Sequence, residues 1–237
     1  MNKYIDFNNI PLNKKRIKID IGLSYGAPHT QIWFENDNIN DDLYVFGFEP
    51  NIYNVQNILN KNIVAGHPYI LENKYIDNNH LCLINVALSN VKEMKEMDFY
   101  CTNNDPGTSS LYCPNNNLND KIKEIIKVPV YSLKHFFDIF DWNRFPYIEY
   151  IKIDAQGSDF DILIGAEDYL KNKVVYITAE PESLQYDNTQ HNNLNNIKNY
   201  LETQDFIFIN HPNTKDPTFI NKNFLYLKDK IYISQVG

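Results

Sequence analysis

The sequence predicts an α/β domain built on a largely parallel sheet that is covered by helices on both faces. Short apolar runs alternate with helical patterns along most of the 237 residues, which is typical of such sheets. Hydrophobic residues make up 43% of the chain and aromatic residues 14%, enough for a sizeable core, which excludes a wholly disordered chain. The length suits one large domain, so we expect a single domain over 1–237 with an N-terminal extension over about 1–15.

The first half of the chain carries strand-sized apolar runs separated by helical patterns. Strands are predicted at 16–21, 43–48 and 81–87. One helix is predicted to begin at Pro28, which suits a first helical turn, and another covers 51–59. Residues 65–79 show no clear period and are predicted to form an inserted loop.

The second half continues the alternation and ends in a predicted hairpin. Further strands are predicted at 97–101, 128–131, 150–153, 174–178 and 205–209. Helices are expected after Ser132, a typical N-cap residue, and after a turn at Gly157. The apolar run 224–227, with 231–233 behind it, predicts an antiparallel C-terminal hairpin around 228–230. Asparagine clusters at 115–117 and 192–196 are expected in surface loops.

Charge and cysteine content narrow the classes of function. The chain has 22 Lys and Arg against 30 Asp and Glu, a net charge of −8, which fits poorly with nucleic-acid or anionic-membrane binding. The three cysteines have neither the even count of a disulfide framework nor the spacing of a zinc site. No stretch resembles a signal peptide or a membrane span. We therefore expect a cytoplasmic protein without nucleic-acid or membrane partners, and its oligomeric state cannot be read from the sequence.

The first group of candidate site residues follows the first predicted strand. Asp20, Gly22 and Gly26 lie in DIGLSYGAP between a strand and a helix, where glycine allows a sharp turn and close approach of a ligand. Glu49 ends the next strand in FGFEPN, where a carboxylate can accept both hydroxyls of an adenosyl ribose. The pairing of these features on consecutive strand ends predicts a nucleoside site.

The same loop favours S-adenosylmethionine over a dinucleotide. Dinucleotide folds prefer the pattern G-x-G-x-x-G, which accepts a pyrophosphate at the helix N-terminus. Here only Gly22 and Gly26 are present, and Asp20 suits an ammonium better than a phosphate. S-adenosylmethionine carries an ammonium, a carboxylate and a sulfonium and no phosphate, so the charge pattern fits it.

Runs of sequence along roughly 17–181 resemble, in order and spacing, the FkbM-type S-adenosylmethionine-dependent methyltransferases. The runs are KIDIG, FGFEPN, NVALS, GTSSL, KIDAQGSDFDILIGAEDYL and ITAEPE. The resemblance implies a Rossmann-like class I methyltransferase fold with seven strands, and methyl transfer to oxygen, often to sugar hydroxyls of glycans or natural products. It implies that the cofactor is held by Asp20, Gly22, Gly26, Glu49, Asn85, Ala87 and Asp154.

The sequence departs from the family pattern at two places. Leu-Ser-Tyr stands between Gly22 and Gly26 instead of the usual small or Asn-bearing residues, and Asp159 replaces a commoner Glu. At Gln156 both Glu and Gln fit the pattern. The first departure affects the details of the loop contacts rather than the family resemblance.

Carboxylates at the strand ends are the candidate catalytic groups. Methyl transfer to a hydroxyl needs an in-line nucleophile and a route for the hydroxyl proton. Asp154 or Glu180 could accept that proton, directly or through water. Alternatively, Asp154, Asp159 and Glu180 could hold a divalent cation that lowers the pKa of the hydroxyl. His29, beside the cofactor loop, is a weaker candidate base.

A polar segment over 102–120 is predicted to be an active-site loop, because loops of this length in compact domains are usually functional or disordered. Its hydroxyls at Ser109 and Ser110, together with Asp159, are predicted to contact the acceptor. We expect the loop to be mobile without ligand and to close over the site when a ligand binds. The aromatic side chains predicted to stack on a sugar are Tyr112, Trp142 and Tyr186.

Other functions remain as alternatives. One is a nucleotide-dependent, NAD-type Rossmann oxidoreductase, which the missing third glycine disfavours. Another is a methyltransferase-fold binding domain without turnover, which the complete set of Asp20, Glu49 and Asp154 disfavours. An RNA methyltransferase is disfavoured by the acidic balance. The leading hypothesis is an O-methyltransferase that acts on a sugar or glycan, although fold similarity does not fix the acceptor.

Overall fold

The computed structural model describes residue 1 and residues 5–37, 40–62 and 71–235. Within these residues, seven strands form the main sheet in the order β3-β2-β1-β7-β8-β10-β9. They are β1 (Arg16–Ile21), β2 (Leu43–Phe48), β3 (Leu81–Ile84), β7 (Ile148–Ile153), β8 (Val174–Ala179), β9 (Phe206–Ile209) and β10 (Thr218–Asn221). β3, β2, β1, β7 and β8 run parallel, and β10 is antiparallel to β8 and β9. This confirms the predicted α/β class and the mostly parallel sheet with antiparallel strands at its C-terminal edge.

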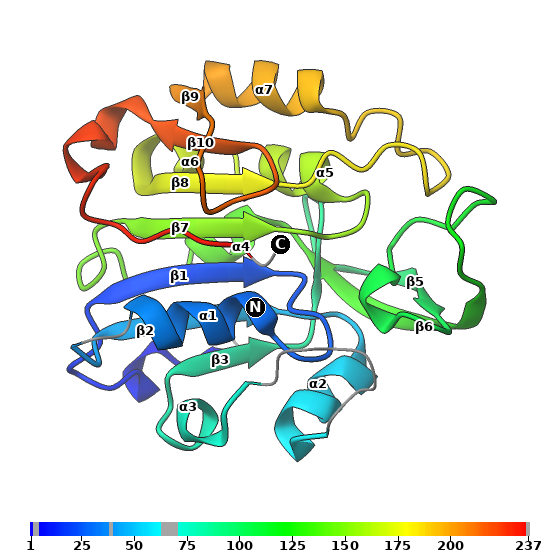
Figure 1. Cartoon of the computed structure of the whole chain (residues 1–237), viewed down its shortest axis with the longest axis horizontal. Coiled ribbons are helices and arrows are strands. Elements are labelled where there is room, and N and C mark those ends of the chain that lie inside the picture. The colour runs from blue at the N-terminus through cyan, green and yellow to red at the C-terminus, as the bar shows by residue number, and fades with distance from the viewer. Residues whose placement is uncertain (2–4, 38–39, 63–70, 236–237) are drawn as a thin grey trace.

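The strand order reverses direction at β1. From β1 the chain builds outward through β2 and β3 on one side, and later through β7 and β8 on the other. The arrowheads of these parallel strands point to the same side of the molecule (Figure 1). Ligands in open parallel sheets bind beyond the carboxyl ends at such a switch point, so the fold places a candidate site between the ends of β1 and β7.

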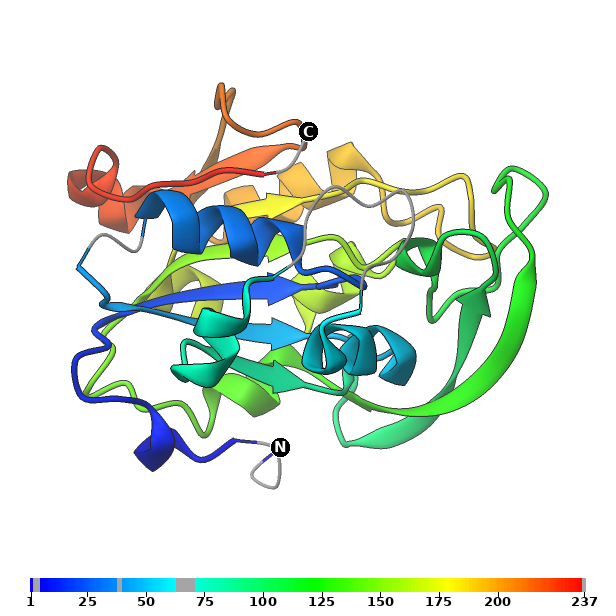
Figure 2. The ribbon, with the colours of Figure 1, turned by 60° about the horizontal axis from the view of Figure 1, so that its bottom comes forward.

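A second, smaller sheet lies beyond those carboxyl ends. It has the order β4-β6-β5 and is formed by β4 (Ala87–Leu88), β5 (Lys95–Thr102) and β6 (Ile122–Tyr131). β5 and β6 make a long curved ribbon that projects from the main sheet (Figure 2). The predicted strands at 97–101 and 128–131 lie within β5 and β6, and the 102–120 loop connects these two strands.

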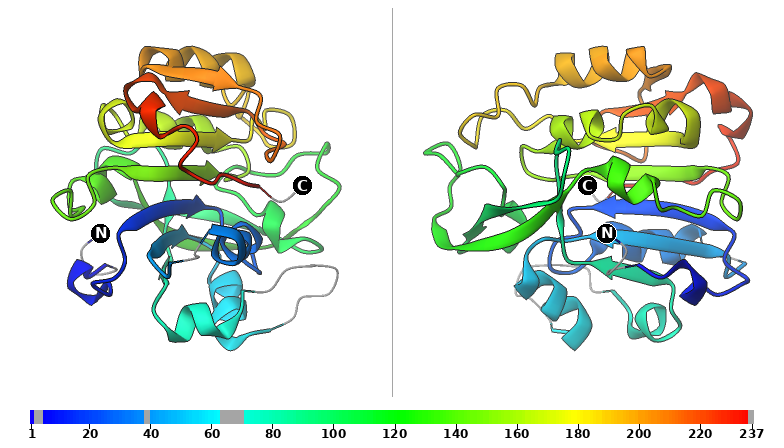
Figure 3. Two further views of the ribbon diagram at one scale, coloured as in Figure 1. Left: turned by 60° about the vertical axis from the view of Figure 1, so that its left-hand side comes forward. Right: turned by 180° about the vertical axis from the view of Figure 1, so that it is seen from behind.

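Helices cover both faces of the main sheet, as predicted (Figure 3). They are α1 (Pro28–Asp37), α2 (Ile52–Asn60), α3 (Asn73–Asp77), α4 (Leu133–Phe137), α5 (Asp159–Ile164), α6 (Tyr169–Lys173) and α7 (Leu194–Thr203). Short 3₁₀ turns occur at η1 (Phe7–Asn9), η2 (Pro106–Thr108) and η3 (Lys222–Leu227). None of the helices in the described ranges is long and apolar enough to span a membrane.

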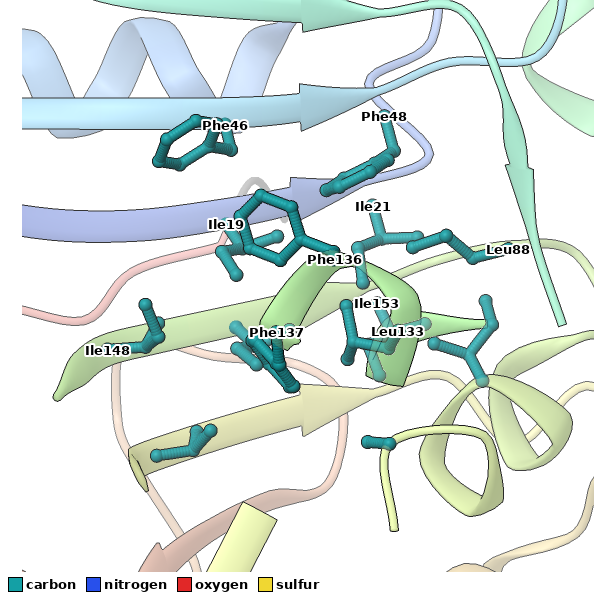
Figure 4. Close-up of a cluster of buried hydrophobic side chains, with 14 of the residues drawn as sticks. Ile19, Ile21, Phe46, Phe48, Leu88, Leu133, Phe136, Phe137, Ile148 and Ile153 are labelled. Carbon is teal, nitrogen blue, oxygen red and sulfur yellow. The ribbon is translucent and has the colours of Figure 1, made fainter. Parts of the chain in front are cut away.

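The core is divided by the sheet into two apolar layers. Ile19 of β1 packs in one layer with Phe136 of α4, whereas Trp33 of α1 lies in the other. This division follows from the alternation of side chains along each strand. In the first layer Phe136 lies 5.1 Å from Phe46 and 5.5 Å from Phe48, measured between ring centroids (Figure 4). These contacts fix the end of β2 and therefore the position of the residue that follows it.

The prediction that residues 81–87 form one strand is wrong. β3 ends at Ile84, and the chain then leaves the main sheet to form β4 in the second sheet. The break occurs at Asn85, whose side-chain amide donates hydrogen bonds to the carbonyl oxygens of Glu49 and Pro50. A continuous apolar pattern therefore spans two sheets.

The predicted C-terminal hairpin is displaced along the sequence. The antiparallel partner of β9 is β10, and residues 224–227 belong to the 3₁₀ turn η3. Phe224 is half-buried and Leu227 is buried, whereas Leu225 and Tyr226 between them are exposed. A spacing of three residues between the inward-facing side chains is that of a helical turn and not of a strand. Asn221 starts the turn by accepting a hydrogen bond from the backbone N–H of Asn223. The hairpin around 228–230 is therefore wrong, although an antiparallel pair does close the sheet.

Two loop predictions also need correction. Asn192 is fully buried, and its side chain accepts a hydrogen bond from the N–H of Phe160, while Asn193 caps α7. The 192–196 cluster is therefore a buried anchor and a helix start, not a surface loop. Of the predicted 65–79 loop, residues 65–70 lie outside the described residues, and 73–77 form α3.

Candidate active site

The residues that directly follow the parallel strands form one row across the sheet. The register aligns Ile84 with Phe48, Phe48 with Ile21, Ile21 with Ile153, and Ile153 with Ala179. The next residues along the strands are Asn85, Glu49, Gly22, Asp154 and Glu180. All of them are predicted site residues, and the fold brings them to the same edge.

A cavity of about 340 Å³ lies at this edge, beneath the second sheet. Its walls come from the loop after β1, the end of β2, β4, the 102–120 loop and the loop after β7. Part of its lining is apolar and includes Val86, Ala87, Leu88, Phe99 and Ile162. Other lining residues, among them Glu49, Lys152 and Asp154, are charged, so the cavity suits a ligand that has both apolar and charged groups.

Gly22 joins the two central strand ends. Its φ is +78°, and a Cβ added there would lie 1.9 Å from the backbone oxygen of Asp154. Only glycine allows the two loop backbones to approach so closely. Gly26 is buried but does not line the cavity, and the loop instead turns through Ser24 and Ala27, which have positive φ values of 60° and 46°.

Glu49 lines the cavity as a buried carboxylate held by the backbone. Its Oε1 accepts a hydrogen bond of 2.8 Å from the N–H of Asn51, and its Oε2 accepts one of 2.8 Å from Ser24. Burial raises the pKa of Glu49 to about 7, although these hydrogen bonds act in the opposite direction. Each oxygen retains a lone pair, so the carboxylate can accept further hydrogen bonds from a ligand.

Asp20 lies behind the cavity wall and does not line it. Its Oδ2 accepts a hydrogen bond of 2.7 Å from the Thr30 hydroxyl, and its Oδ1 lies 3.5 Å from the Lys152 Nζ. Burial raises the pKa of Asp20, and the Lys152 charge opposes that rise. Asp20 thus contacts Thr30 and Lys152 in this structure, and its contact with a ligand ammonium stays a prediction.

Lys152 lines the cavity although it was not among the predicted site residues; in the sequence it begins the run KIDAQG. Its side chain is fully buried, lies 3.4 Å from Asp154 Oδ2, and donates a 3.1 Å hydrogen bond to the Gly22 carbonyl. It stands two residues before Asp154 and in register with Asp20. The strand alternation that places Lys152 and Asp20 on one face was the signal that could have identified it.

Asp154 and Glu180 form a hydrogen-bonded carboxyl pair whose pKa values shift in opposite directions. Burial alone would raise the pKa of Asp154, but Lys152 and hydrogen bonds with Glu180 and Gln156 lower it to about 2. Burial and the Asp154 charge raise the pKa of Glu180 to about 9. The two shifts have opposite signs, which favours the ionised form of Asp154 and the protonated form of Glu180. Only Asp154 of the two lines the cavity.

Asp159 supports the site from below. It is fully buried, and its carboxylate accepts hydrogen bonds of 3.0 Å from the N–H of Glu180 and 3.2 Å from that of Ala155. Asp159 does not line the cavity and instead ties two strand-end loops together. The predicted contact of Asp159 with an acceptor has no support in this geometry. Among the described residues, no group of three or more His, Cys, Asp or Glu side chains is arranged to hold a metal ion.

The 102–120 loop lies against the loop that follows β1 and forms part of the cavity wall. Asp105 and Gly107 line the cavity, and a Cβ added at Gly107 would lie 2.9 Å from the Ser24 hydroxyl oxygen. Ser109 lines the cavity as predicted, whereas Ser110 is fully buried and donates its hydroxyl to the Gln156 carbonyl. The 102–120 loop therefore contacts both the loop after β1, at Ser24, and the loop after β7, at Gln156.

The aromatic and histidine candidates divide between cavity and core. His29 lines the cavity. Tyr112 donates a 2.5 Å hydrogen bond to Asp161. Tyr186 is buried, and Trp142 packs on Phe140 with 4.5 Å between ring centroids. None of these three aromatic side chains lines the cavity, so the predicted sugar stacking has no geometric support there.

Glu49→Gln should weaken the binding of a nucleoside ligand by about 1 to 3 kcal/mol, because charge-assisted bonds to the ribose hydroxyls become neutral ones. Isothermal calorimetry with adenosyl ligands measures the change. Gln has the same shape, but its amide nitrogen cannot accept one of the two backbone N–H hydrogen bonds that Glu49 accepts, so the melting temperature without ligand should also fall. Unchanged affinity would show that Glu49 does not contact the ribose.

Amide hydrogen exchange in 103–119 should slow when a ligand fills the cavity, because the loop forms part of its wall. The strand β7, buried on both faces, is the internal reference and should exchange slowly in both states. Equal protection of the loop with and without ligand would contradict the prediction that it closes.

Comparison with known proteins supports the methyltransferase resemblance. A family model described as Methyltransferase FkbM domain matches residues 20–208, about four-fifths of the chain. No curated protein and no solved structure matches the sequence significantly.

Proposed function

The chain belongs to the FkbM methyltransferase family, and from this premise we propose that it transfers the methyl group of S-adenosylmethionine to a hydroxyl of a sugar or glycan. The observation that carries the proposal is the row of strand-end residues around one cavity, with Glu49 and the ionised Asp154 on either side of Gly22. These two carboxylates suit the two ends of the same ligand.

The residues present fit S-adenosylmethionine. Glu49 can accept the ribose hydroxyls, and the apolar wall around Ala87 can hold the adenine. The ionised Asp154 gives the far end a negative charge, which favours a sulfonium and an ammonium. When bound, this cofactor supplies an electrophilic methyl group on a positively charged sulfur.

We assign to Asp154 the role of accepting the proton of the acceptor hydroxyl, because it is the member of the carboxyl pair that lines the cavity. As the hydroxyl oxygen forms its new bond to carbon, its proton becomes strongly acidic, so even a carboxylate of low pKa can remove it. Lys152 and Gln156 hold the two oxygens of Asp154 in a fixed orientation. Glu180, whose pKa is raised by burial and by the Asp154 charge and which does not line the cavity, serves as a hydrogen-bond partner of Asp154 rather than as the base.

The experiment that tests this function is a screen for labelled methyl transfer to neutral sugars, nucleotide sugars and short glycans, with and without a chelator. Binding is checked separately by thermal unfolding: S-adenosylmethionine should stabilise the protein by roughly 2 to 3 kcal/mol at a hundredfold excess over its dissociation constant. NAD is the matched control ligand. A shift with NAD and none with S-adenosylmethionine would contradict the cofactor assignment, and loss of transfer with the chelator would reveal a metal requirement.

A further inference from the structure

We propose that Gln156 is a positioning residue that links the 102–120 loop to the geometry of the Asp154–Glu180 pair. Gln156 follows β7 and lines the cavity, but nothing in its chemistry makes it a base or a nucleophile. Its role in methyl transfer rests on the proposed function, whereas its effect on the carboxyl pair does not.

The side-chain amide of Gln156 binds both carboxyl groups. Nε2 donates a hydrogen bond of 2.7 Å to Asp154 Oδ1 and one of 3.2 Å to Glu180 Oε2. The two amide hydrogens thus hold the pair from one side, while Lys152 holds Asp154 from the other. The donated bond favours the ionised form of Asp154, as a donor to a carboxylate must.

The other polar groups of Gln156 contact the loop and its support. The Tyr186 hydroxyl lies 2.8 Å from Gln156 Oε1 and 2.8 Å from the carbonyl oxygen of Thr108, so its proton is shared between them. The Ser110 hydroxyl donates a 2.6 Å hydrogen bond to the Gln156 carbonyl. Because Oε1 faces the Tyr186 hydroxyl, Nε2 faces the carboxyl pair. Tyr186 also contacts the loop at Thr108, so it connects the loop to the amide.

The backbone of Gln156 supports a specific demand for this side chain. Its φ is +51°, in the left-handed region that favours Gly or Asn over longer side chains. Asn would suit this backbone better but is one methylene shorter. The strained conformation is thus combined with a side chain long enough to contact Tyr186 and both carboxyl groups, a pattern typical of functional sites.

The test compares Gln156→Met, which removes the polar atoms and keeps the length, with Gln190→Met, the same change at an exposed position of the segment after β8. Carboxyl carbon NMR titration of the ligand-free protein measures the Asp154–Glu180 pair. We expect the acidic titration step to move up by about one pH unit or more in Gln156→Met, through loss of a hydrogen bond to a charged group, and to stay in place in Gln190→Met. An unchanged titration would overturn the proposal.

Turnover is the second measurement. In Gln156→Met, kcat should fall by on the order of 10- to 100-fold through misplacement of Asp154, with the KM for S-adenosylmethionine little changed. Tyr186→Phe keeps Gln156 and the ring but releases Oε1, so it should lower kcat in the same direction, and it serves if Gln156→Met does not fold. Normal kcat in both variants would overturn the linkage. If the unmodified protein transfers no methyl group, the proposed function fails, while the titration still decides the contact of Gln156 with the pair.

Discussion

Replacing Asp154 with asparagine should lower kcat for methyl transfer by about 10² or more. The affinity for S-adenosylmethionine should fall by a smaller factor, because a negative charge near its sulfonium and ammonium is lost. The substitution keeps the shape and one acceptor oxygen of the side chain and removes the charge that receives the hydroxyl proton. Lys152 retains Asp20 as a partner at 3.5 Å, so the buried ammonium is not left without a counter-charge. Steady-state kinetics with saturating cofactor, together with calorimetric binding, measures the two effects separately.

The matched control for this substitution is Asp187→Asn, which makes the same change of charge at an exposed position in the segment between β8 and α7. Its kinetics should equal those of the unmodified protein. If Asp154→Asn lowers the affinity by as large a factor as kcat, Asp154 mainly holds the cofactor. If activity survives nearly intact, the assignment of Asp154 as the base fails and Glu180 becomes the better candidate.

Gly22→Ala should be the most damaging single methyl group that can be added to the site. The backbone there has φ of +78°, and the new Cβ would lie 1.9 Å from the Asp154 carbonyl oxygen, which belongs to backbone and cannot rotate away. We expect a loss of about 2 to 5 kcal/mol in the free energy of unfolding, from the left-handed conformation and the overpacking together. Urea denaturation measures it as a lower midpoint.

Gly107→Ala provides the comparison. A Cβ at Gly107 meets the Ser24 hydroxyl oxygen at 2.9 Å, and that side chain can rotate. Its effect on the free energy of unfolding should therefore be clearly smaller than that of Gly22→Ala. Equal midpoints for the two variants would contradict the view that the close approach of the two central loops limits what position 22 accepts.

The sequence was most informative where a local pattern decides the structure. β1 and β2 begin and end at the predicted residues. β1 alternates charged and apolar side chains and is followed by Gly22, whereas β2 is a continuous run of LYVFGF followed by Glu49. The residue that ends such a run must lie at the sheet edge, so Glu49 and Asp154 could be placed in the site without a structure.

The features that the sequence does not predict depend on contacts between segments that are distant in the sequence. Asp20 has the sequence context of a ligand-binding acid, but Lys152, on another strand, already contacts it. β10 is short and polar at both ends, so the apolar pattern favours 224–227 as the last strand, although these residues form the turn η3. Gln156 carries no charge, and only its simultaneous contacts with Tyr186 and the carboxyl pair show its importance.

The buried carboxyl group of Glu49 has a consequence for the energetics of cofactor binding. With a pKa of about 7, roughly half of the ligand-free molecules carry a proton on Glu49 at neutral pH. Ribose hydroxyls that donate hydrogen bonds favour the ionised form, so binding should expel this proton into the solvent. The heat measured in calorimetry would then depend on the ionisation enthalpy of the buffer. The apparent affinity would rise as pH increases through about 7, which makes the occupancy of the site responsive to small changes in acidity.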